Sequence, residues 1–162
     1  MHWIYLNEIR IYFSKIYIIV PVGIIKDSKD LIPLQFENVE ILSVPFYSNY
    51  KGSLKTFFHY IHRYYFLPQV DVVYSRYPAP FGWLQKVFLK NKKRIIHYVG
   101  DPLDAAKHNP NFSKTKKTIL TTLFKPEERL FLWACNGAKI FTNGFDISDK
   151  LKLLFHNLLF NY

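Results

Sequence analysis

Short apolar runs separated by amphipathic stretches are the feature that most limits the folds open to this sequence. Four runs rich in Ile, Val and Tyr, and a weaker fifth, are predicted to be strands: Ile16–Val22, Val39–Phe46, Val70–Ser75, Arg94–Val99 and Lys139–Thr142. Strands that alternate with helices are typical of a parallel sheet covered by helices. The sequence therefore predicts an α/β fold with a Rossmann-like parallel sheet and helices on both faces.

The stretches between the strands carry apolar residues at helical spacing. Predicted helices cover Ser53–Phe66, Phe81–Leu89, Thr118–Cys135 and Ser148–Phe160. Pro126 lies inside the third of these, which is expected to bend or divide there because proline lacks a backbone N–H. Residues Asp101–Lys117 are polar and are expected to form a long loop, a length that favours a functional role.

The first segment of the chain allows two interpretations. Leu6, Ile9, Phe13 and Ile16 fit one face of a helix, whereas Ile9–Phe13 could instead form a strand. We favour the helix.

Length and charge narrow the classes of function. A chain of 162 residues is expected to form one domain. Its 22 Lys and Arg residues against 12 Asp and Glu residues give a net charge of +10, which favours a lipid surface, a nucleic acid or a phosphorylated substrate as partner. Two basic clusters are candidate contacts to a membrane or another anion: Lys90, Lys92, Lys93 and Arg94, and Lys114, Lys116 and Lys117.

Several kinds of site are not expected. The single cysteine, Cys135, excludes an internal disulfide framework. The six glycines are scattered and form neither a dinucleotide turn nor a phosphate-binding loop. His59 and His62 have no carboxylate or cysteine nearby in sequence, so no metal site is expected. No apolar run reaches the roughly 18 to 20 residues that span a bilayer.

Polar side chains follow three of the predicted strands. They are Arg76, Asp101 and Asn143, and open parallel sheets bind ligands beyond the carboxyl ends of their strands. The turn after Arg76 leads into a helix whose first amides could bind an anion. Asp101 and Asp104 place two carboxylates where a general base could act on a sugar hydroxyl. The same residue types also serve as ordinary turn and cap residues, so both interpretations stay open.

Three segments together resemble the amino-terminal half of family 4 glycosyltransferases. They are Val70–Pro78, Lys93–Asp101 and Ala138–Gly144, and the resemblance extends from about Ile16 to Leu154. It implies the GT-B architecture, in which two Rossmann-like domains face a cleft. The amino-terminal domain of this architecture binds the acceptor, and the carboxyl-terminal domain binds the nucleotide sugar.

The resemblance also implies roles for individual residues. Arg76 would hold an anionic group of the acceptor, and Asp101 or His97 would orient the acceptor hydroxyl as candidate catalytic residues. Family members commonly carry a His directly before the Gly that ends this strand, whereas here Val99 is at that position. His97 lies two residues earlier, so it should face the same side but lie deeper. Further acceptor contacts are expected from Pro78, Gly82, Gly100, Asp104 and Asn143.

The family's first strand and its donor domain have no counterpart in the sequence. Residues 1–162 are therefore expected to form a single incomplete Rossmann-like domain, inactive alone, whose nucleotide sugar donor binds the missing domain. In a sheet ordered 3-2-1-4-5-6 the first strand is central, so its loss leaves two unpaired edges. Either Ile9–Phe13 substitutes as a strand or the chain is poorly stable.

The sequence thus predicts the acceptor-side domain of an enzyme that transfers a sugar from a nucleotide sugar to a glycan or lipid-linked acceptor. We expect it in the cytoplasm, with peripheral attachment to the inner face of the cell membrane. One alternative is a noncatalytic basic module that binds nucleic acid or an anionic surface, although no RNA-binding sheet or helix-turn-helix pattern is recognisable. A nonfunctional gene remnant is the other alternative.

Overall fold

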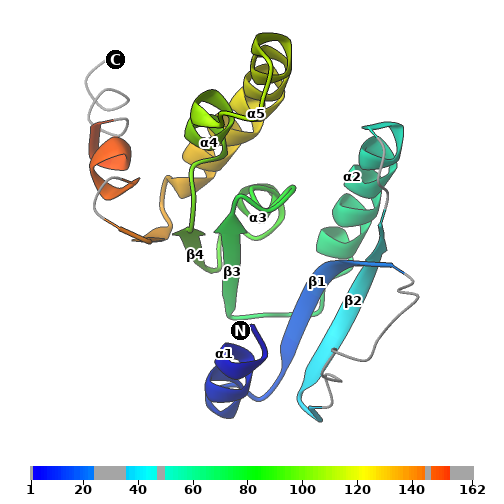
Figure 1. Cartoon of the computed structure of the whole chain (residues 1–162). Coiled ribbons are helices and arrows are strands. Elements are labelled where there is room, and N and C mark those ends of the chain that lie inside the picture. The colour runs from blue at the N-terminus through cyan, green and yellow to red at the C-terminus, as the bar shows by residue number, and fades with distance from the viewer. Residues whose placement is uncertain (1, 24–35, 47–49, 145–146, 154–162) are drawn as a thin grey trace. The chain divides into compact units, whose positions relative to one another are not determined.

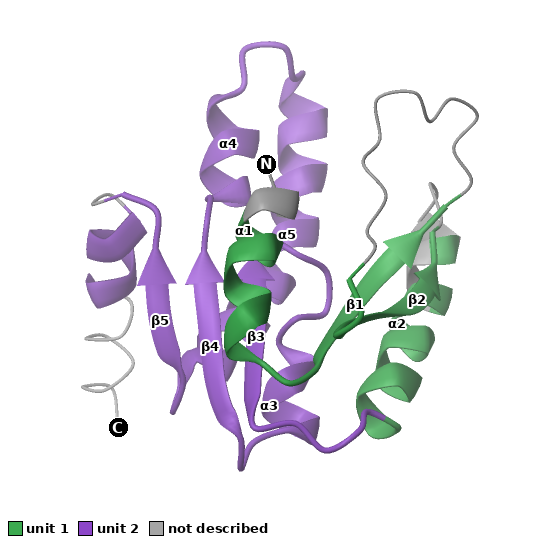
Figure 2. Cartoon of the chain, turned by 90° about the horizontal axis from the view of Figure 1, so that it is seen from below, with its two compact units in different colours: residues 1–66 green, residues 67–162 purple. Residues whose placement is uncertain are grey.

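A computed structural model of the chain describes residues 2–23, 36–46, 50–144 and 147–153 (Figure 1). The chain divides into two compact units, Met1–Phe66 and Leu67–Tyr162, which Figure 2 distinguishes by colour. Every strand pair in the described residues is parallel, and helices alternate with strands along the chain. The predicted α/β class and its Rossmann-like arrangement are confirmed.

The first unit is a small two-stranded sheet with helices. Its elements are α1 (His2–Ile9), a 3₁₀ turn (Arg10–Tyr12), β1 (Ile16–Val22), β2 (Val39–Pro45) and α2 (Tyr50–Tyr65). β1 and β2 pair in register from Ile16 opposite Val39 to Val22 opposite Pro45. The helical interpretation of the first segment is confirmed, and the side-chain amide of Asn38 donates to the carbonyls of Arg10 and Phe13 where the turn ends.

The second unit contains a three-stranded sheet. Its elements are β3 (Val72–Tyr77), α3 (Leu84–Phe88), β4 (Lys93–Tyr98), α4 (Pro102–His108), α5 (Lys114–Cys135), β5 (Lys139–Thr142) and a helical segment at residues 147–153. The strand order is β3-β4-β5, so β4 is central. The arrowheads of β4 and β5 point toward the end of the unit where α4 lies (Figure 2). The carboxyl end of β4 thus meets the α4–α5 hairpin.

One face of this sheet is packed against the last turns of α5. Phe131, fully buried, lies 4.9 Å from Tyr77 and 6.4 Å from Tyr98 between ring centroids. Ile96, from β4, is also fully buried in this core. Gly82 packs so closely against Phe131 that a Cβ at position 82 would lie only 2.7 Å from the ring. Three aromatic residues, Tyr77, Tyr98 and Phe131, therefore form the centre of the core of the second unit.

Two expectations differ from the structure: a predicted long loop is largely helical, and the helix that contains Pro126 does not divide there. Residues Asp101–Lys117 are not a long loop, because α4 occupies seven of them and the Asp101 carboxylate caps this helix by accepting the Asp104 N–H at 3.0 Å. α5 begins at Lys114 and is a single helix through Pro126. The carbonyl that proline leaves without its helical donor is that of Thr122, an exposed residue, so water can satisfy it.

The strands that the structure describes form two separate sheets, and β1 and β3 each lie at an edge of their own sheet. Residues Ile9–Phe13 do not supply a further strand, because Ile9 ends α1, Arg10–Tyr12 form the 3₁₀ turn and Phe13 belongs to no strand. Among the described helices, none combines the length and the apolar character needed to cross a membrane.

Candidate functional site

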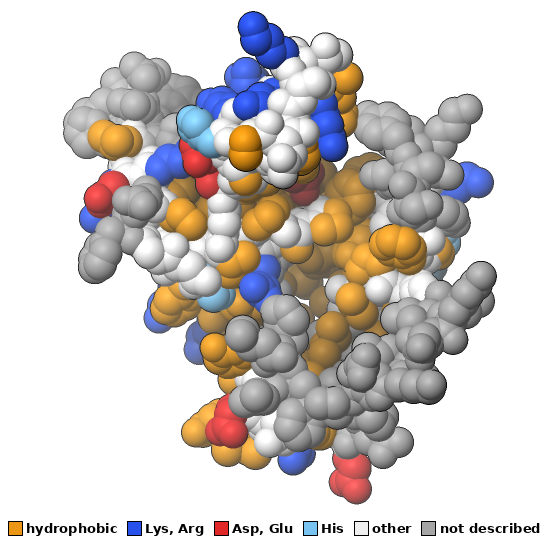
Figure 3. Space-filling view, in the orientation of Figure 1, with side chains coloured by type: hydrophobic (Ala, Val, Ile, Leu, Met, Phe, Trp, Pro, Cys, Tyr) orange, Lys and Arg blue, Asp and Glu red, His pale blue; other side chains and the backbone are white. Residues whose placement is uncertain are grey.

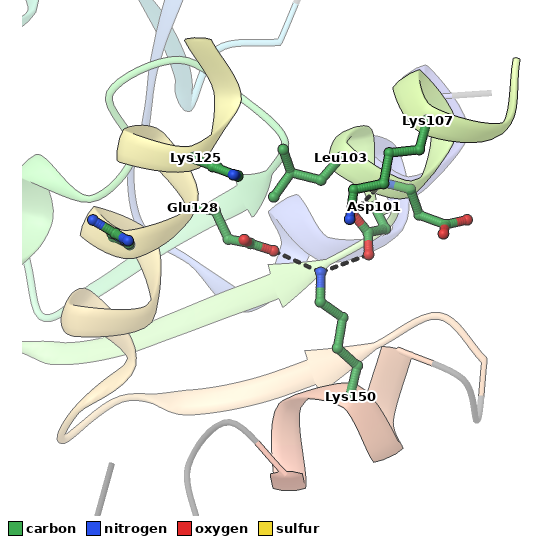
Figure 4. A pocket seen from close by; sticks show the side chains of 8 residues that line it. Asp101, Leu103, Lys107, Lys125, Glu128 and Lys150 are labelled. Carbon is green, nitrogen blue, oxygen red and sulfur yellow. Dashed lines mark hydrogen bonds and ion pairs between the residues drawn. The ribbon is translucent and has the colours of Figure 1, made fainter. Parts of the chain in front are cut away.

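A pocket of about 430 Å³ lies in the second unit, beyond the carboxyl end of β4 (Figure 4). It is formed by the start of α4, the middle of α5 and the helical segment 147–153. All but one of its lining residues are ionisable: Asp101, Leu103, Asp104, Lys107, Lys125, Glu128, Arg129 and Lys150. A pocket with this lining suits a polar or charged ligand rather than an apolar one.

At the base of the pocket, one lysine bridges two carboxylates. The Lys150 Nζ lies 2.6 Å from Asp101 Oδ2 and 2.6 Å from Glu128 Oε1 (Figure 4). Asp101 follows β4, Glu128 comes from α5 and Lys150 from residues 147–153, so the bridge joins three elements. The carboxylates are more buried than the lysine, with side chains 20% and 14% exposed against 37%.

The bridge changes the pKa values of Asp101 and Lys150. Burial alone would raise the pKa of Asp101, but hydrogen bonds from Lys150 and from the Asp104 N–H outweigh burial and lower it. Burial alone would lower the pKa of Lys150, but its hydrogen bonds to Asp101 and Glu128 outweigh burial and raise it. Both groups are therefore charged over the physiological pH range.

A carboxylate with a lowered pKa is a poor general base, because its affinity for a proton is reduced. It remains a good hydrogen-bond acceptor, since each oxygen has two acceptor positions and Asp101 uses one on each for Asp104 and Lys150. Asp101 can thus accept a hydrogen bond from a hydroxyl group of a ligand in the pocket. This arrangement is suited to binding and orienting a hydroxyl, and less to removing its proton.

The turn after β3 is held by a carboxylate of the same chain. Glu127 accepts hydrogen bonds from the Phe81 N–H at 2.9 Å and from the Trp83 indole N–H at 3.1 Å. Burial raises the pKa of Glu127, and these two hydrogen bonds partly offset that effect. Phe81 has φ of 61°, an uncommon conformation for a residue with a side chain. The expected anion contact at this turn is therefore made within the chain, by Glu127.

A second polar cluster contains two of the predicted site residues. His97 Nδ1 lies 2.7 Å from the Tyr74 hydroxyl, and His97 Nε2 lies 2.7 Å from Asn143 Oδ1. An amide oxygen only accepts, so Nε2 donates to Asn143, and Nδ1 shares a hydrogen bond with the Tyr74 hydroxyl. His97 alternates along β4 with the buried Tyr98, so this cluster lies on the sheet face opposite the Phe131 core. Arg76 is beside His97 in register.

The predicted strand-end residues are thus divided between two places. Asp101 and Asp104 line the pocket, whereas Arg76, His97 and Asn143 belong to the other sheet face and do not line it. Gly100 lies below the pocket, beside a cavity of about 10 Å³ that is no larger than a water molecule. Pro78 is exposed, and Gly82 is buried against Phe131, where it serves packing rather than acceptor binding.

Sequence reasoning missed the other charged residues of the pocket. Lys125, Glu128 and Arg129 lie at i, i+3 and i+4 on α5, a spacing that places them on one helix face and could have indicated the site. Lys150 gave no comparable signal, because its pairing with Asp101 joins residues 49 positions apart.

The two basic clusters differ from expectation in one residue. Arg94 is 4% exposed, and its guanidinium donates at 2.7 Å to the carbonyls of Ala134 and Asn136. The prediction that Arg94 contacts an external anion is wrong, because its donors stabilise the end of α5. Lys90, Lys93, Lys114 and Lys116 are exposed, as a surface contact requires.

The part of the chain that the structure describes contains no group of three or more His, Cys, Asp or Glu residues arranged to hold a metal ion. The free Cys135 is buried, and burial raises the pKa of its thiol to about 11. Comparisons with protein-family models, curated proteins and solved structures found no match to this chain.

Proposed function

We propose that this chain is the acceptor-side domain of a glycosyltransferase and that its pocket binds the acceptor through Asp101, Glu128 and Lys150. The observation that carries the proposal is the position of this charged pocket, beyond the carboxyl end of the central strand β4. Open parallel sheets bind their ligands at this end. The resemblance of the strand-end segments to family 4 glycosyltransferases supports the assignment of reaction class.

The size and charge of the pocket support a hydroxylated, anionic acceptor. Its volume of about 430 Å³ lies within the usual range for small-ligand sites. Four of its lining residues are cationic and three are acidic. The cationic side chains can bind a phosphate, while sugar hydroxyls donate hydrogen bonds to the carboxylates. A glycan or lipid-linked acceptor with a phosphate group has this chemistry.

Each residue of the pocket has its own role in this proposal. Asp101 accepts a hydrogen bond from the acceptor hydroxyl and orients its oxygen toward the donor sugar. Lys150 fixes the direction of the Asp101 carboxylate through their 2.6 Å contact. Lys107, Lys125 and Arg129 attract the anionic group of the acceptor at the rim. The nucleotide sugar is bound by a second domain of the GT-B architecture.

Peripheral attachment to an anionic membrane is part of the same proposal. The net charge of +10 favours an anionic surface, and a lipid-linked acceptor is presented at such a surface. The enzyme would then act on the inner face of the cell membrane.

Isothermal titration calorimetry with short oligosaccharides that carry or lack a terminal phosphate tests acceptor binding. Lys150→Met should weaken binding by roughly tenfold or more, because it removes a charged contact and releases Asp101. Lys152→Met is the matched control, since Lys152 lies on the same helical segment and pairs with the exposed Asp149 rather than with a residue of the pocket. Equal affinity of both variants and of the original chain would contradict the pocket assignment.

A second experiment tests the reaction class. The chain is incubated with labelled nucleotide sugars and lipid acceptors, alone and with the donor domain of a GT-B enzyme. We expect no transfer by the chain alone. Rapid transfer by the chain alone would contradict the division of roles between two domains.

A further inference from the structure

The hairpin of α4 and α5 carries a strongly basic surface. We define the basic tip as residues 105–125, which extend from the middle of α4 through the connection to the middle of α5. The basic tip contains five lysines and no Asp or Glu: Lys107, Lys114, Lys116, Lys117 and Lys125. The space-filling view shows Lys and Arg side chains gathered over this hairpin (Figure 3).

These lysines have no acidic partner in the described part of the hairpin. Within the described residues none of the five takes part in an ion pair. Three of them lie in the first turn of α5, where positive charge opposes the helix dipole. Lys116 does contact Phe112, with its Nζ 4.0 Å from the ring centroid. The charge of the basic tip therefore costs stability, and an external anionic partner would explain it.

Exposed aliphatic side chains lie beside these lysines. Ile119 is 54% exposed and Leu123 is 44% exposed. Together with Lys116 they have the spacing i, i+3 and i+7, which places all three on one face of α5. A helix face that combines lysine with exposed aliphatic residues is typical of helices that lie in a membrane interface.

We infer that the basic tip is the surface that docks on an anionic lipid membrane. This inference rests on the peripheral attachment proposed above and names the part of the molecule that carries it. The lysines meet the negative headgroups, while Ile119 and Leu123 enter the boundary between headgroups and acyl chains. A nucleic acid would match the lysines but would leave the aliphatic side chains exposed, so a lipid surface explains both observations.

The position of the pocket agrees with this partner. Lys107 and Lys125 belong to both the basic tip and the pocket lining, and they lie around the ion-paired base of Asp101 and Lys150 (Figure 4). A membrane bound at the tip would therefore adjoin the pocket, so that a phosphate at the lipid surface could reach these lysines. The basic tip and the acceptor pocket therefore share two lysines.

The other basic cluster provides a matched control. Lys90, Lys92 and Lys93 lie before or at the start of β4, at the opposite end of this strand from α4. This cluster has three lysines, the same number as the first turn of α5. Mutating either cluster changes the total charge equally, so a difference in binding reports the location of the surface rather than net charge.

Flotation with vesicles of phosphatidylcholine, with or without phosphatidylglycerol, tests the inference on the full chain. We compare K114E/K116E/K117E, K90E/K92E/K93E and I119S/L123S with the original chain, each checked for folding by circular dichroism. Binding should require phosphatidylglycerol. Each lysine near an anionic surface contributes about 1 kcal/mol, so the α5 reversal should weaken partitioning by roughly a hundredfold or more. The β4 reversal should change it only a few fold, and I119S/L123S should also weaken it.

The inference would be overturned by equal binding to vesicles with and without phosphatidylglycerol, or by equal losses of vesicle binding for K114E/K116E/K117E and K90E/K92E/K93E. It would also be overturned if single-stranded RNA bound the basic tip more tightly than the vesicles and released the chain from them. Lys150→Met separates this inference from the acceptor proposal, because it should keep vesicle binding while losing oligosaccharide binding. If vesicle binding fails and oligosaccharide binding persists, the docking surface is wrong and the pocket assignment stands.

Discussion

The two halves of α5 both carry large apolar side chains but have very different surroundings. The inner half, residues 127–135, supplies every buried residue of the helix, and Phe131 and Ala134 are fully buried. The outer half, residues 114–125, contains Ile119, Leu120, Leu123 and Phe124 and buries none of them. The inner half lies against β3 and β4, whereas the outer half is packed mainly by α4. Apolar residues become core only where a sheet face is available to cover them.

The two halves of α5 are expected to contribute differently to stability and to binding. In the inner half, side chains contact the fold, and their loss should reduce the free energy of unfolding. In the outer half, Ile119 and Leu123 face solvent, and their loss should reduce binding while stability stays the same. The following substitutions test this distinction, beginning with the largest expected effect.

Phe131→Ala should be the most damaging single change. It leaves a cavity beside Tyr77, Tyr98 and Gly82 and should lower the free energy of unfolding by about 3–5 kcal/mol. Urea unfolding measures this loss. Ile119→Ala, in the outer half, is the control and should cost no more than about 0.5 kcal/mol. Similar losses of unfolding free energy for Phe131→Ala and Ile119→Ala would contradict the distinction between the inner and outer halves of α5.

Arg94→Met should have the next largest effect. It removes the guanidinium donor of the Ala134 carbonyl and leaves the Asn136 carbonyl with Lys86 Nζ as its side-chain donor, at a cost of about 2–3 kcal/mol. Lys93→Met, at the exposed neighbouring position, should change stability little. If chemical denaturation gives both variants the stability of the original chain, the Arg94 contacts do not stabilise α5.

Lys150→Met removes the bridge between Asp101 and Glu128. Two carboxylates then lose their cation, and the free energy of unfolding should fall by about 1–2 kcal/mol, an amount limited by the partial exposure of Lys150. Lys152→Met breaks only an exposed pair and should cost about 0–0.5 kcal/mol. A larger loss for Lys152→Met would show that the pocket bridge has no structural role.

The smallest predicted effect is a pH dependence of stability. The pKa of Asp101 is lowered in the folded state, because hydrogen bonds outweigh burial, so its stabilisation is lost as the pH falls through that lowered value. The pKa of Lys150 is raised, so its stabilisation is lost as the pH rises through that raised value. The bridge should therefore stabilise the fold from about pH 4 to about pH 10.

Thermal unfolding across this range measures the bridge contribution as the difference between the original chain and Lys150→Met. The difference should shrink at both extremes of pH. Glu127 affects stability in the opposite direction from Asp101. Burial raises the pKa of Glu127, so its ionisation lowers the stability of the fold as the pH rises. A difference that stays constant with pH would contradict the assigned pKa shifts.

Local patterns predicted much of the fold. The strands Ile16–Val22 and Lys139–Thr142 were predicted with their observed bounds, because runs of β-branched and aromatic residues followed by turn residues give clear ends. The helix α4 was missed, since its seven residues include few apolar positions and it depends on the Asp101 cap. The predicted helix Ser148–Phe160 is described only at residues 147–153 and is helical there.

The candidate site was less predictable than the fold. The rule that ligands bind at strand ends led to Asp101 and Asp104, which do line the pocket. The same rule grouped them with Arg76 and Asn143, which face another side, because residues near a strand end can project to either face of a sheet. Lys150 and Glu128 depend on how distant elements pack, and that information is not present in any local pattern.

The most direct test of the contrast within α5 is hydrogen–deuterium exchange with and without phosphatidylglycerol vesicles. In solution, amides of residues 127–135 should exchange more slowly than those of residues 114–125, because the inner half is covered by the core. On vesicles, new protection should be confined to residues 105–125. Protection at residues 90–93 instead, or no change at residues 105–125 when the chain is bound, would contradict the account.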